Sequence, residues 1–326
     1  MTLHLADSWV WDFWLVDDGA EYHAFFLYAS RALQDPDARH LRASVGHAVS
    51  TDLRSWTRVA DALVHSDAPA FDDVATWTGS IVRHPDGRWF QFYTGTSMPG
   101  GRNVQTVGYA TSDDLLTWTK NPANPLLRAD ERWHHRLVDG GWDHEAFRDP
   151  WVFADGDGWT MFVTARAVGA RAGECGGGIV ARAHSTDLEH WQALPPLTTP
   201  GHGFEQLEVV QTFALDGQAF ITFSCLAPEL AGPRRETTAT GGIWVAPGES
   251  LSGPFDLEAA QLLTDDSLYV GRVIAERETG RPLFLAFRHN APDGSFVGDI
   301  SDPFEIGVVD GVVRIEPSPV VNGAVG

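Results

Sequence analysis

The chain is poor in basic residues and in cysteine. Its 326 residues include 23 Lys and Arg against 44 Asp and Glu, which gives a formal charge of −21 at pH 7. A field of this sign repels phosphate groups and anionic membranes, so neither nucleic acid nor a membrane is expected as a partner. The two cysteines, Cys175 and Cys225, are too few for a disulfide framework, and we expect ordinary buried residues unless the fold brings them together.

Long apolar runs and leader-like segments are also missing. No stretch reaches the roughly 18 apolar residues that a membrane span needs, and the N-terminus has no basic region followed by an apolar one. We therefore expect a cytoplasmic protein, provided that no leader was removed. Helical periodicity is weak as well, and even residues 31–47 are expected to form a loop between strands.

The histidines and glycines form no familiar metal or phosphate motif. Trp133-His134-His135 lacks the i, i+4 spacing of a helical zinc pair. Gly176-Gly177-Gly178 leads into a predicted strand and not into a helix, so it does not favour a phosphate site. We predict neither a metal nor a cofactor.

What the sequence does contain is a repeated phrase, Ser-x-Asp-Leu-x-x-Trp. It begins at Ser50, Ser112 and Ser185, and so recurs at intervals of 62 and 73 residues. A recurrence at such intervals indicates a repeated supersecondary unit. The Ser and Asp side chains are suited to bonding nearby backbone amides in a turn, and the Trp to packing between neighbouring units. We interpret the phrase as scaffold rather than as a set of sugar-stacking residues.

Short strand-like segments lie around these repeats. Five of them follow an Asp-Gly or Thr-Gly turn and are the clearest strands: Glu21–Ala29, Trp89–Gly95, Trp159–Ala165, Ala219–Ser224 and Pro282–Phe287. A strand that begins the unit precedes each of these: Trp11–Val16, Trp77–Val82, Arg148–Ala154, Glu208–Leu215 and Val270–Ala275. Further strands are predicted at Ala43–Ser50, Val104–Ser112, Gly178–Ser185, Gly242–Ala246, Pro303–Ile306 and Val312–Ile315. Five such units predict a five-bladed β-propeller, all-β, as one domain over residues 1–326, since a β-sandwich would leave the repeat unexplained.

Three of the five first strands open with a carboxylate beside apolar or aromatic residues: Asp12, Asp149 and Glu208. Asp is uncommon in strands, and the first strand of each propeller blade lines the central channel. A single Asp at a strand entry usually caps a turn or pairs with an Arg, as Arg148 would allow for Asp149. Three carboxylates that converge on one channel repel one another, so a chemical role is the better explanation.

Cleavage of a glycoside would use such a set. One ionised carboxylate attacks the anomeric carbon, while a second carboxyl with a raised pKa protonates the leaving oxygen and then activates water. Asp12 lies between Trp11 and Trp14, whose rings are suited to stacking on a sugar, and we predict that Asp12 is the nucleophile. Glu208 has apolar neighbours on both sides, so we expect burial to raise its pKa and predict that it is the acid/base.

The same segments resemble known motifs. Trp11-Asp12-Phe13-Trp14 is similar to the Trp-Asp-Ser-Trp segment of the levansucrase family, glycoside hydrolase family 68. Trp77-Thr78-Gly79-Ser80 resembles the Trp-Ser-Gly-Ser segment of that family and of the invertase family, 32, and Arg148-Asp149-Pro150 resembles the Arg-Asp-Pro motif of both. Glu205-Gln206-Leu207-Glu208 resembles their Glu-rich acid/base segment. The resemblance implies a five-bladed propeller in which Asp12 is the nucleophile, Asp149 stabilises the transition state by gripping fructosyl hydroxyls, and Glu208 is the acid/base.

Other residues of these segments are predicted to bind the substrate: Trp11, Trp14, Trp77, Ser80, Arg148 and Glu205. Glu205 is an alternative acid/base, although we favour a role in holding the sugar. Arg148 is as well suited to a structural ion pair. His144 and Glu145 precede the strand that carries Arg148 and Asp149, so a contact with the leaving group is an option. Loop residues of this kind more often have no role in the reaction.

The predicted function is a retaining glycoside hydrolase that acts on β-fructofuranosides, with a small sugar or an oligosaccharide as its partner. Transfer of the fructosyl group to a second sugar is a variant of the same chemistry. Two alternatives stay open: an inverting arabinanase or arabinofuranosidase on a related propeller, and a non-catalytic carbohydrate-binding propeller. A separation of about 5–5.5 Å between the two carboxyl groups favours retention, and roughly 6.5–9.5 Å favours inversion. The sequence specifies neither the natural substrate nor the oligomeric state.

Overall fold

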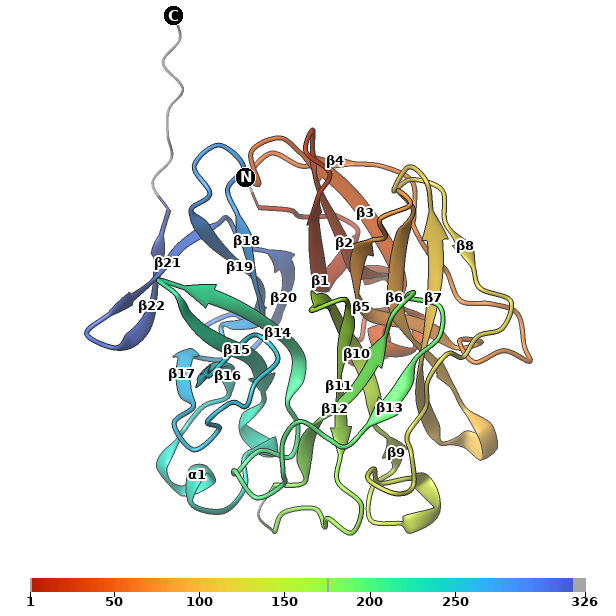
Figure 1. Cartoon of the computed structure of the whole chain (residues 1–326), viewed down its shortest axis with the longest axis vertical. Coiled ribbons are helices and arrows are strands. Elements are labelled where there is room, and N and C mark those ends of the chain that lie inside the picture. The colour runs from red at the N-terminus through yellow and green to blue at the C-terminus, as the bar shows by residue number, and fades with distance from the viewer. Residues whose placement is uncertain (1, 175, 319–326) are drawn as a thin grey trace, which may run out of the picture.

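Five antiparallel sheets follow one another around a common centre in the computed structural model, which describes residues 2–174 and 176–318 (Figure 1). Blade 1 contains β1 (Ser8–Asp17), β2 (Tyr22–Ser30), β3 (Ser44–Ser50) and β4 (Thr57–Arg58). Blade 2 contains β5 (Ala75–Arg83), β6 (Trp89–Ser97), β7 (Asn103–Ser112) and β8 (Thr119–Lys120), with β9 (His144–Glu145) parallel to β7. Blade 3 contains β10 (Phe147–Asp155), β11 (Gly158–Arg166), β12 (Gly178–Ser185) and β13 (Gln192–Leu194).

The last two blades continue the pattern. Blade 4 contains β14 (Glu208–Leu215), β15 (Gln218–Cys225), β16 (Gly242–Gly248) and β17 (Gln261–Thr264). Blade 5 contains β18 (Leu268–Ala275), β19 (Pro282–Asn290), β21 (Phe304–Val309) and β22 (Val312–Pro317), and β20 (Phe296–Ile300) pairs with β19. Short helical segments occupy the loops: η1 (Arg31–Leu33), η2 (Asp37–Arg42), η3 (Pro99–Gly101), η4 (Leu137–Asp139), η5 (Ala227–Glu229) and α1 (Gly232–Thr237).

The first strands of the blades form the inner ring. Each of β1, β5, β10, β14 and β18 contacts the first strand of the next blade, and β18 contacts β1, which closes the circle. The N-terminal segment reinforces this closure, since Leu3 forms a β-bridge with Ile300 of β20. The predicted five-bladed β-propeller is therefore confirmed.

The repeated phrase forms the same turn three times. In the second copy the Asp114 carboxylate accepts hydrogen bonds from the Leu116 and Thr117 amides at 2.8 and 2.7 Å, and Leu115 adopts a left-handed backbone with φ 62°. Trp118 lies edge-on against Phe25 of blade 1 with ring centroids 5.8 Å apart. Trp191 of the third copy contacts Phe92 of blade 2 in the same way, at 5.4 Å. Both parts of the scaffold interpretation, the turn and the packing between blades, are confirmed.

A β-bulge interrupts every first strand close to its start. The register with the second strand shifts between Trp11 and Phe13, between Trp77 and Gly79, and at the corresponding places of β10, β14 and β18. A bulge leaves one residue outside the ladder and re-aims the side chains beside it. The bulged residues of the first three blades are Asp12, Thr78 and Asp149 with its following Pro150, so these bulges coincide with the predicted chemical residues.

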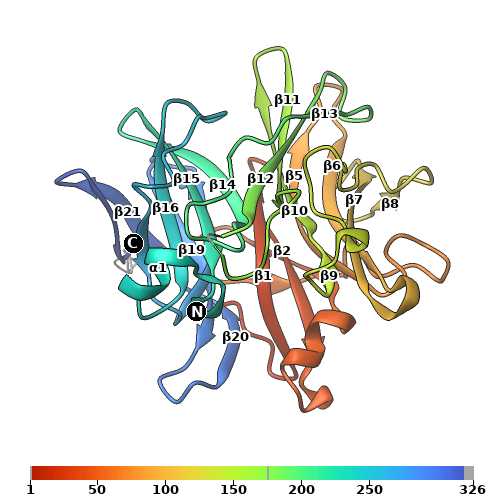
Figure 2. The same cartoon turned by 90° about the horizontal axis from the view of Figure 1, so that it is seen from below.

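Two sequence predictions need correction or fall outside the described residues. The segment 31–47 is not a plain loop, because it forms η1 and η2 before entering β3. These turns lie at the lower side of Figure 2, as does the loop between β19 and β20. Cys225 is buried, whereas Cys175 lies outside the described residues. Among the residues that the structure describes, no helix is long and apolar enough to cross a membrane.

Candidate active site

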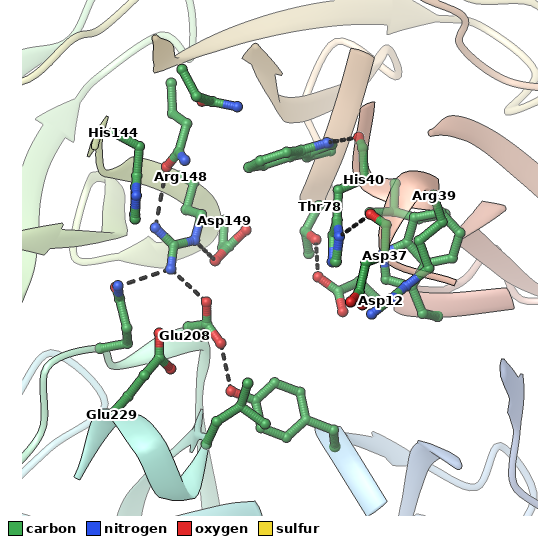
Figure 3. Close-up of a pocket in the computed structure, with 18 of the residues that line it drawn as sticks. Asp12, Asp37, Arg39, His40, Thr78, His144, Arg148, Asp149, Glu208 and Glu229 are labelled. Carbon is green, nitrogen blue, oxygen red and sulfur yellow. Dashed lines mark hydrogen bonds and ion pairs between the residues drawn. The ribbon is translucent and has the colours of Figure 1, made fainter. Parts of the chain in front are cut away.

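A cavity of about 640 Å³ opens where the inner strands begin, and all five blades contribute to its wall. Blades 1 to 3 each supply two neighbouring residues at the bulge: Trp11 and Asp12, Trp77 and Thr78, Arg148 and Asp149. Glu208 of β14 and Tyr269 of β18 complete the ring, and Figure 3 shows the three carboxylates around one open space. The structure thus brings Asp12, Asp149 and Glu208 together from positions far apart in the sequence.

Asp12 is held by a hydroxyl from the next blade. The Thr78 hydroxyl donates to Asp12 Oδ2 at 2.5 Å. Burial nevertheless raises the pKa of Asp12 to about 6, because it outweighs the Thr78 hydrogen bond, and the nearby charge of Glu208 adds to the rise. The guanidinium groups of Arg39 and Arg272 act in the opposite direction. Asp12 is therefore ionised in most molecules at neutral pH.

Asp149 occupies a strained position on the cavity wall. Its φ is 60°, a left-handed conformation that non-glycine residues rarely adopt. The Asp149 amide donates to Thr94 Oγ1 at 2.8 Å, and the Thr94 hydroxyl donates to the Thr78 carbonyl at 3.1 Å, so one side chain of β6 fixes the bulges of blades 2 and 3. Burial raises the pKa of Asp149 to about 7 in spite of Arg148, whose Nε lies 3.4 Å from Oδ2.

Glu208 is surrounded by donors. Arg148 Nη2 lies 2.5 Å from Oε1, and the Tyr269 hydroxyl donates to Oε2 at 2.5 Å. Burial alone would raise the pKa of Glu208, but the charge and hydrogen bond of Arg148 and the Tyr269 hydroxyl hold it below its usual range. The expectation that apolar sequence neighbours raise this pKa is wrong, since the cross-blade donors outweigh them.

The Arg148 guanidinium group contacts several polar side chains around Glu208. Besides Glu208 and Asp149, its guanidinium donates to Gln105 Oε1 at 3.1 Å and to Gln206 Oε1 at 2.9 Å. The residue is 7% exposed, so these partners replace the water that a buried cation loses. Arg148 both lines the cavity and forms the ion pair that the sequence offered as the alternative.

The opposite wall is aromatic and comes from η2 and the first two blades. His40 lies edge-on to Trp11 and to Trp77, with ring centroids 6.2 and 6.3 Å away, and Trp77 Nε1 donates to the His40 carbonyl at 2.7 Å. Burial lowers the pKa of His40 to about 4, so its imidazole is neutral at pH 7. Neutral rings and indoles provide the apolar faces on which sugars stack.

Three residues predicted to contact the substrate do not line this cavity: Trp14, Ser80 and Glu205. Trp14 stacks on Phe25 within blade 1, and Ser80 Oγ accepts a hydrogen bond from the Val152 amide. In an unbroken strand Trp14 would share a face with Asp12, and Ser80 with Thr78. The bulges at Asp12 and at Thr78 shift this alternation by one residue, so the side chains of Trp14 and Ser80 turn into the blades. Glu205 accepts hydrogen bonds from the Gly173 and Gly177 amides instead.

Several cavity residues were not predicted from the sequence, among them Thr78, Arg39, His40, Gln206, Glu229 and Tyr269. Thr78 and Gln206 lie within the motif segments, and Tyr269 directly precedes the predicted strand Val270–Ala275, so a position at a strand start was a usable signal. Arg39, His40 and Glu229 come from loops without periodicity, and nothing in the sequence marked them. His144 also lines the cavity, whereas Glu145 does not.

No metal site accompanies these carboxylates in the described part of the chain. Within residues 2–174 and 176–318, no group of three or more His, Cys, Asp or Glu side chains is arranged to hold a metal ion. The arrangement that is present supplies ionisable carboxyl groups, hydrogen-bond donors and aromatic walls.

The fold and the cavity together define a five-bladed β-propeller in which several carboxyl groups surround one cavity. The sequence model of the glycosyl hydrolases family 32 N-terminal domain matches residues 14–267, and the chain belongs to this family. This finding confirms the family resemblance of the motifs at Trp77 and Arg148.

The alignments with curated relatives cover part of this chain and a smaller part of each relative. A β-fructofuranosidase of Arabidopsis thaliana is 30% identical over 194 residues, which are 56% of this chain and 32% of the relative. A fructan 1-exohydrolase of Triticum aestivum is 37% identical over 123 residues, which are 36% of this chain and 19% of the relative. The alignments therefore span about a third or less of these longer proteins.

Solved structures share the fold over almost the whole chain. A β-fructofuranosidase of Bombyx mori superposes with a TM-score of 0.73 at 19% identity, covering 97% of this chain and 64% of that one. The levansucrase of Bacillus subtilis gives a TM-score of 0.73 at 15% identity, covering 96% of this chain and 88% of that one. An inulosucrase of Halalkalicoccus jeotgali, solved with kestose bound, gives 0.75 at 20% identity and covers 95% and 87%.

Proposed function

We propose that the protein is a retaining glycoside hydrolase that acts on β-fructofuranosides. The observation that carries the proposal is the convergence of Asp12, Asp149 and Glu208 on one cavity from the inner strands of three blades. Family membership supports it, as do the β-fructofuranosidase and the fructan 1-exohydrolase named above.

The proposed reaction has two steps. In the first, an Asp12 carboxylate oxygen attacks the anomeric carbon, the bond to the leaving oxygen breaks, and that oxygen takes a proton from Glu208. In the second, Glu208 removes a proton from water, the water oxygen attacks the same carbon, and the Asp12 carboxylate leaves. A sugar hydroxyl in place of water turns the second step into fructosyl transfer.

The surroundings of each carboxyl group suit these roles. Thr78 occupies Asp12 Oδ2, so we assign the attack to Oδ1. Asp149, fixed by its bulge and by Thr94, is placed to hold sugar hydroxyls without joining the bond changes. Arg148 and Tyr269 fix the Glu208 carboxyl, so that the acid/base and the nucleophile keep a constant orientation.

The cavity is suited to an uncharged sugar. Its wall includes six carboxyl groups and three guanidinium groups, and the arginines already have partners within the protein: Arg148 in the Glu208 pair, Arg102 on the Trp142 carbonyl and Arg39 on the Pro36 carbonyl. A phosphorylated sugar would meet an excess of negative charge there. We therefore propose sucrose or a short fructan as the substrate, rather than a sugar phosphate. We also propose a cytoplasmic location, into which such a sugar would be imported.

A panel of fructosides and arabinofuranosides tests the proposal. We expect release of fructose from sucrose or a fructo-oligosaccharide, with the β-anomer appearing first by NMR. Asp12→Asn should lower kcat by at least about 1,000-fold, because the covalent step loses its nucleophile. Ordinary turnover by a folded Asp12→Asn protein, or an inverted first product, would contradict the mechanism. Binding of glycans without any turnover would favour a carbohydrate-binding propeller.

A further inference from the structure

Glu229 is a fourth carboxyl group at the acid/base side of the cavity. It ends η5, in the loop that connects β15 to β16, and lines the cavity beside Glu208. Figure 3 shows the carboxyl groups of Glu229 and Glu208 turned toward the same region. The Glu229 Oε2 atom is closed off from solvent and has no hydrogen-bond partner in the described structure. A buried carboxylate oxygen in this state is costly unless it carries a proton or meets a ligand.

The charged and titratable groups that face Glu229 come from five strands. Glu208 of β14 repels its ionised form, while Arg148 of β10 and Arg166 of β11 attract it. Cys225 of β15 and Tyr269 of β18 also face this group. Burial raises the pKa of Glu229 to about 7, and the charge of Glu208 adds to the rise.

The hydrogen bonds to Glu208 favour its ionised form. Its two oxygens already accept from Arg148 and Tyr269, an arrangement that stabilises the carboxylate rather than the acid. An acid/base must nevertheless deliver a proton to the leaving oxygen in the first step. Glu229 is the neighbouring carboxyl group without such donors on its buried oxygen.

We propose that Glu229 and Glu208 form a carboxyl pair that shares one proton, in which Glu229 stores the proton and Glu208 transfers it. As the leaving oxygen takes its proton from Glu208, that proton is the one Glu229 passes to Glu208, so both carboxyl groups are ionised at the end of the first step. In the second step water gives a proton to Glu208, and the proton returns to Glu229. The pair therefore ends each cycle as it began. Glu229 is in this sense a positioning residue, which acts through Glu208. The inference rests on the proposed function.

Glu229→Gln keeps the shape of the side chain and removes the stored proton. The proton must then reside on Glu208, whose pKa lies below its ordinary value of 4.5, instead of on a group that titrates near 7. The basic limb of the kcat/KM profile should move to lower pH by more than two pH units, and kcat/KM on sucrose at pH 7 should fall by at least about 100-fold. A p-nitrophenyl fructofuranoside, whose leaving group needs no proton, should lose far less.

Asp37→Asn is the matched control. It also removes a carboxylate from the cavity wall, but the Asp37 side chain is 93% exposed and comes from η2, on the opposite wall. The basic limb of the kcat/KM profile of Asp37→Asn should stay at the same pH as in the wild type on both substrates. Glu229→Asp, which keeps an acid, should recover most of the sucrose activity. Equal losses on both substrates in Glu229→Gln, with an unmoved basic limb, would overturn the proposal.

A second measurement separates this inference from the proposed function. If the wild-type protein cleaves no fructoside, the proposed function fails, but the pair is still testable by infrared spectroscopy. The wild-type spectrum minus that of Glu229→Gln at pH 6 should contain the band of one protonated carboxyl group, which disappears as the pH rises through about 7. Absence of that band would overturn the carboxyl pair, whatever the substrate. Glu229→Ala provides the same difference spectrum if Glu229→Gln does not fold.

Discussion

Removal of the Thr78 hydroxyl should shift the acid limb of the activity profile. Thr78→Val keeps the volume of the side chain but loses the 2.5 Å hydrogen bond to Asp12 Oδ2. A hydrogen bond to a charged group contributes about 1.5–3 kcal/mol, which corresponds to roughly one to two pKa units. Because this bond stabilises the carboxylate, its loss raises the pKa of Asp12 from about 6 toward 7–8.

The loss of activity should depend on pH. Only the ionised form of Asp12 attacks, so kcat/KM should fall by about 10- to 100-fold at pH 5 and stay nearly unchanged at pH 9. The assay is fructose release over this pH range. Thr76→Val is the matched control, because Thr76 lies on the same strand and its buried Oγ1 has no hydrogen-bond partner in the described structure. Its profile should follow that of the wild type. A Thr78→Val profile that is lowered equally at every pH would refute the proposed link between this hydroxyl and the nucleophile.

Two further predictions concern the scaffold. Gly79→Ala should destabilise the fold by about 3 kcal/mol or more in a urea titration, because the new Cβ would lie 1.9 Å from the Phe92 carbonyl oxygen, a backbone atom that cannot move aside. A loss below 1 kcal/mol would show that the strands separate easily. Asp114→Ala should cost about 1–2 kcal/mol, since it removes two hydrogen bonds of the repeated turn. Its exposed neighbour provides the comparison, and an Asp113→Ala protein that loses as much would contradict the role of the phrase.

The blade order and the three carboxylates were predictable because they depend on local signals. The Trp of the repeated phrase, the Asp-Gly turns and the strand-like segments recur from blade to blade, and three of the five first strands begin with a carboxylate. The bulges were not predictable, because nothing local shows that Asp149 adopts a φ of 60°. The bulges also explain why Trp14 and Ser80, which the sequence predicted as substrate contacts, do not line this cavity.

The electrostatics of the site depend on contacts between distant segments. Arg148 and Tyr269, which set the pKa of Glu208, lie 60 and 61 residues from it in sequence and come from different blades. Glu229 and His40 come from loops whose positions are fixed only when the propeller closes. Sequence patterns could therefore identify that the three carboxylates meet, but neither the loop residues that join them nor the protonation states that result.

The Thr94 side chain, which bonds the bulges of blades 2 and 3, has a mechanical consequence. Since its hydroxyl joins the Thr78 carbonyl to the Asp149 amide, a displacement of either bulge is transmitted to the other through two hydrogen bonds. Thr78 in turn holds Asp12 of blade 1. Three blades are thus joined at the cavity by side-chain hydrogen bonds, so we expect a substitution at one bulge to change the position of Asp12 as well.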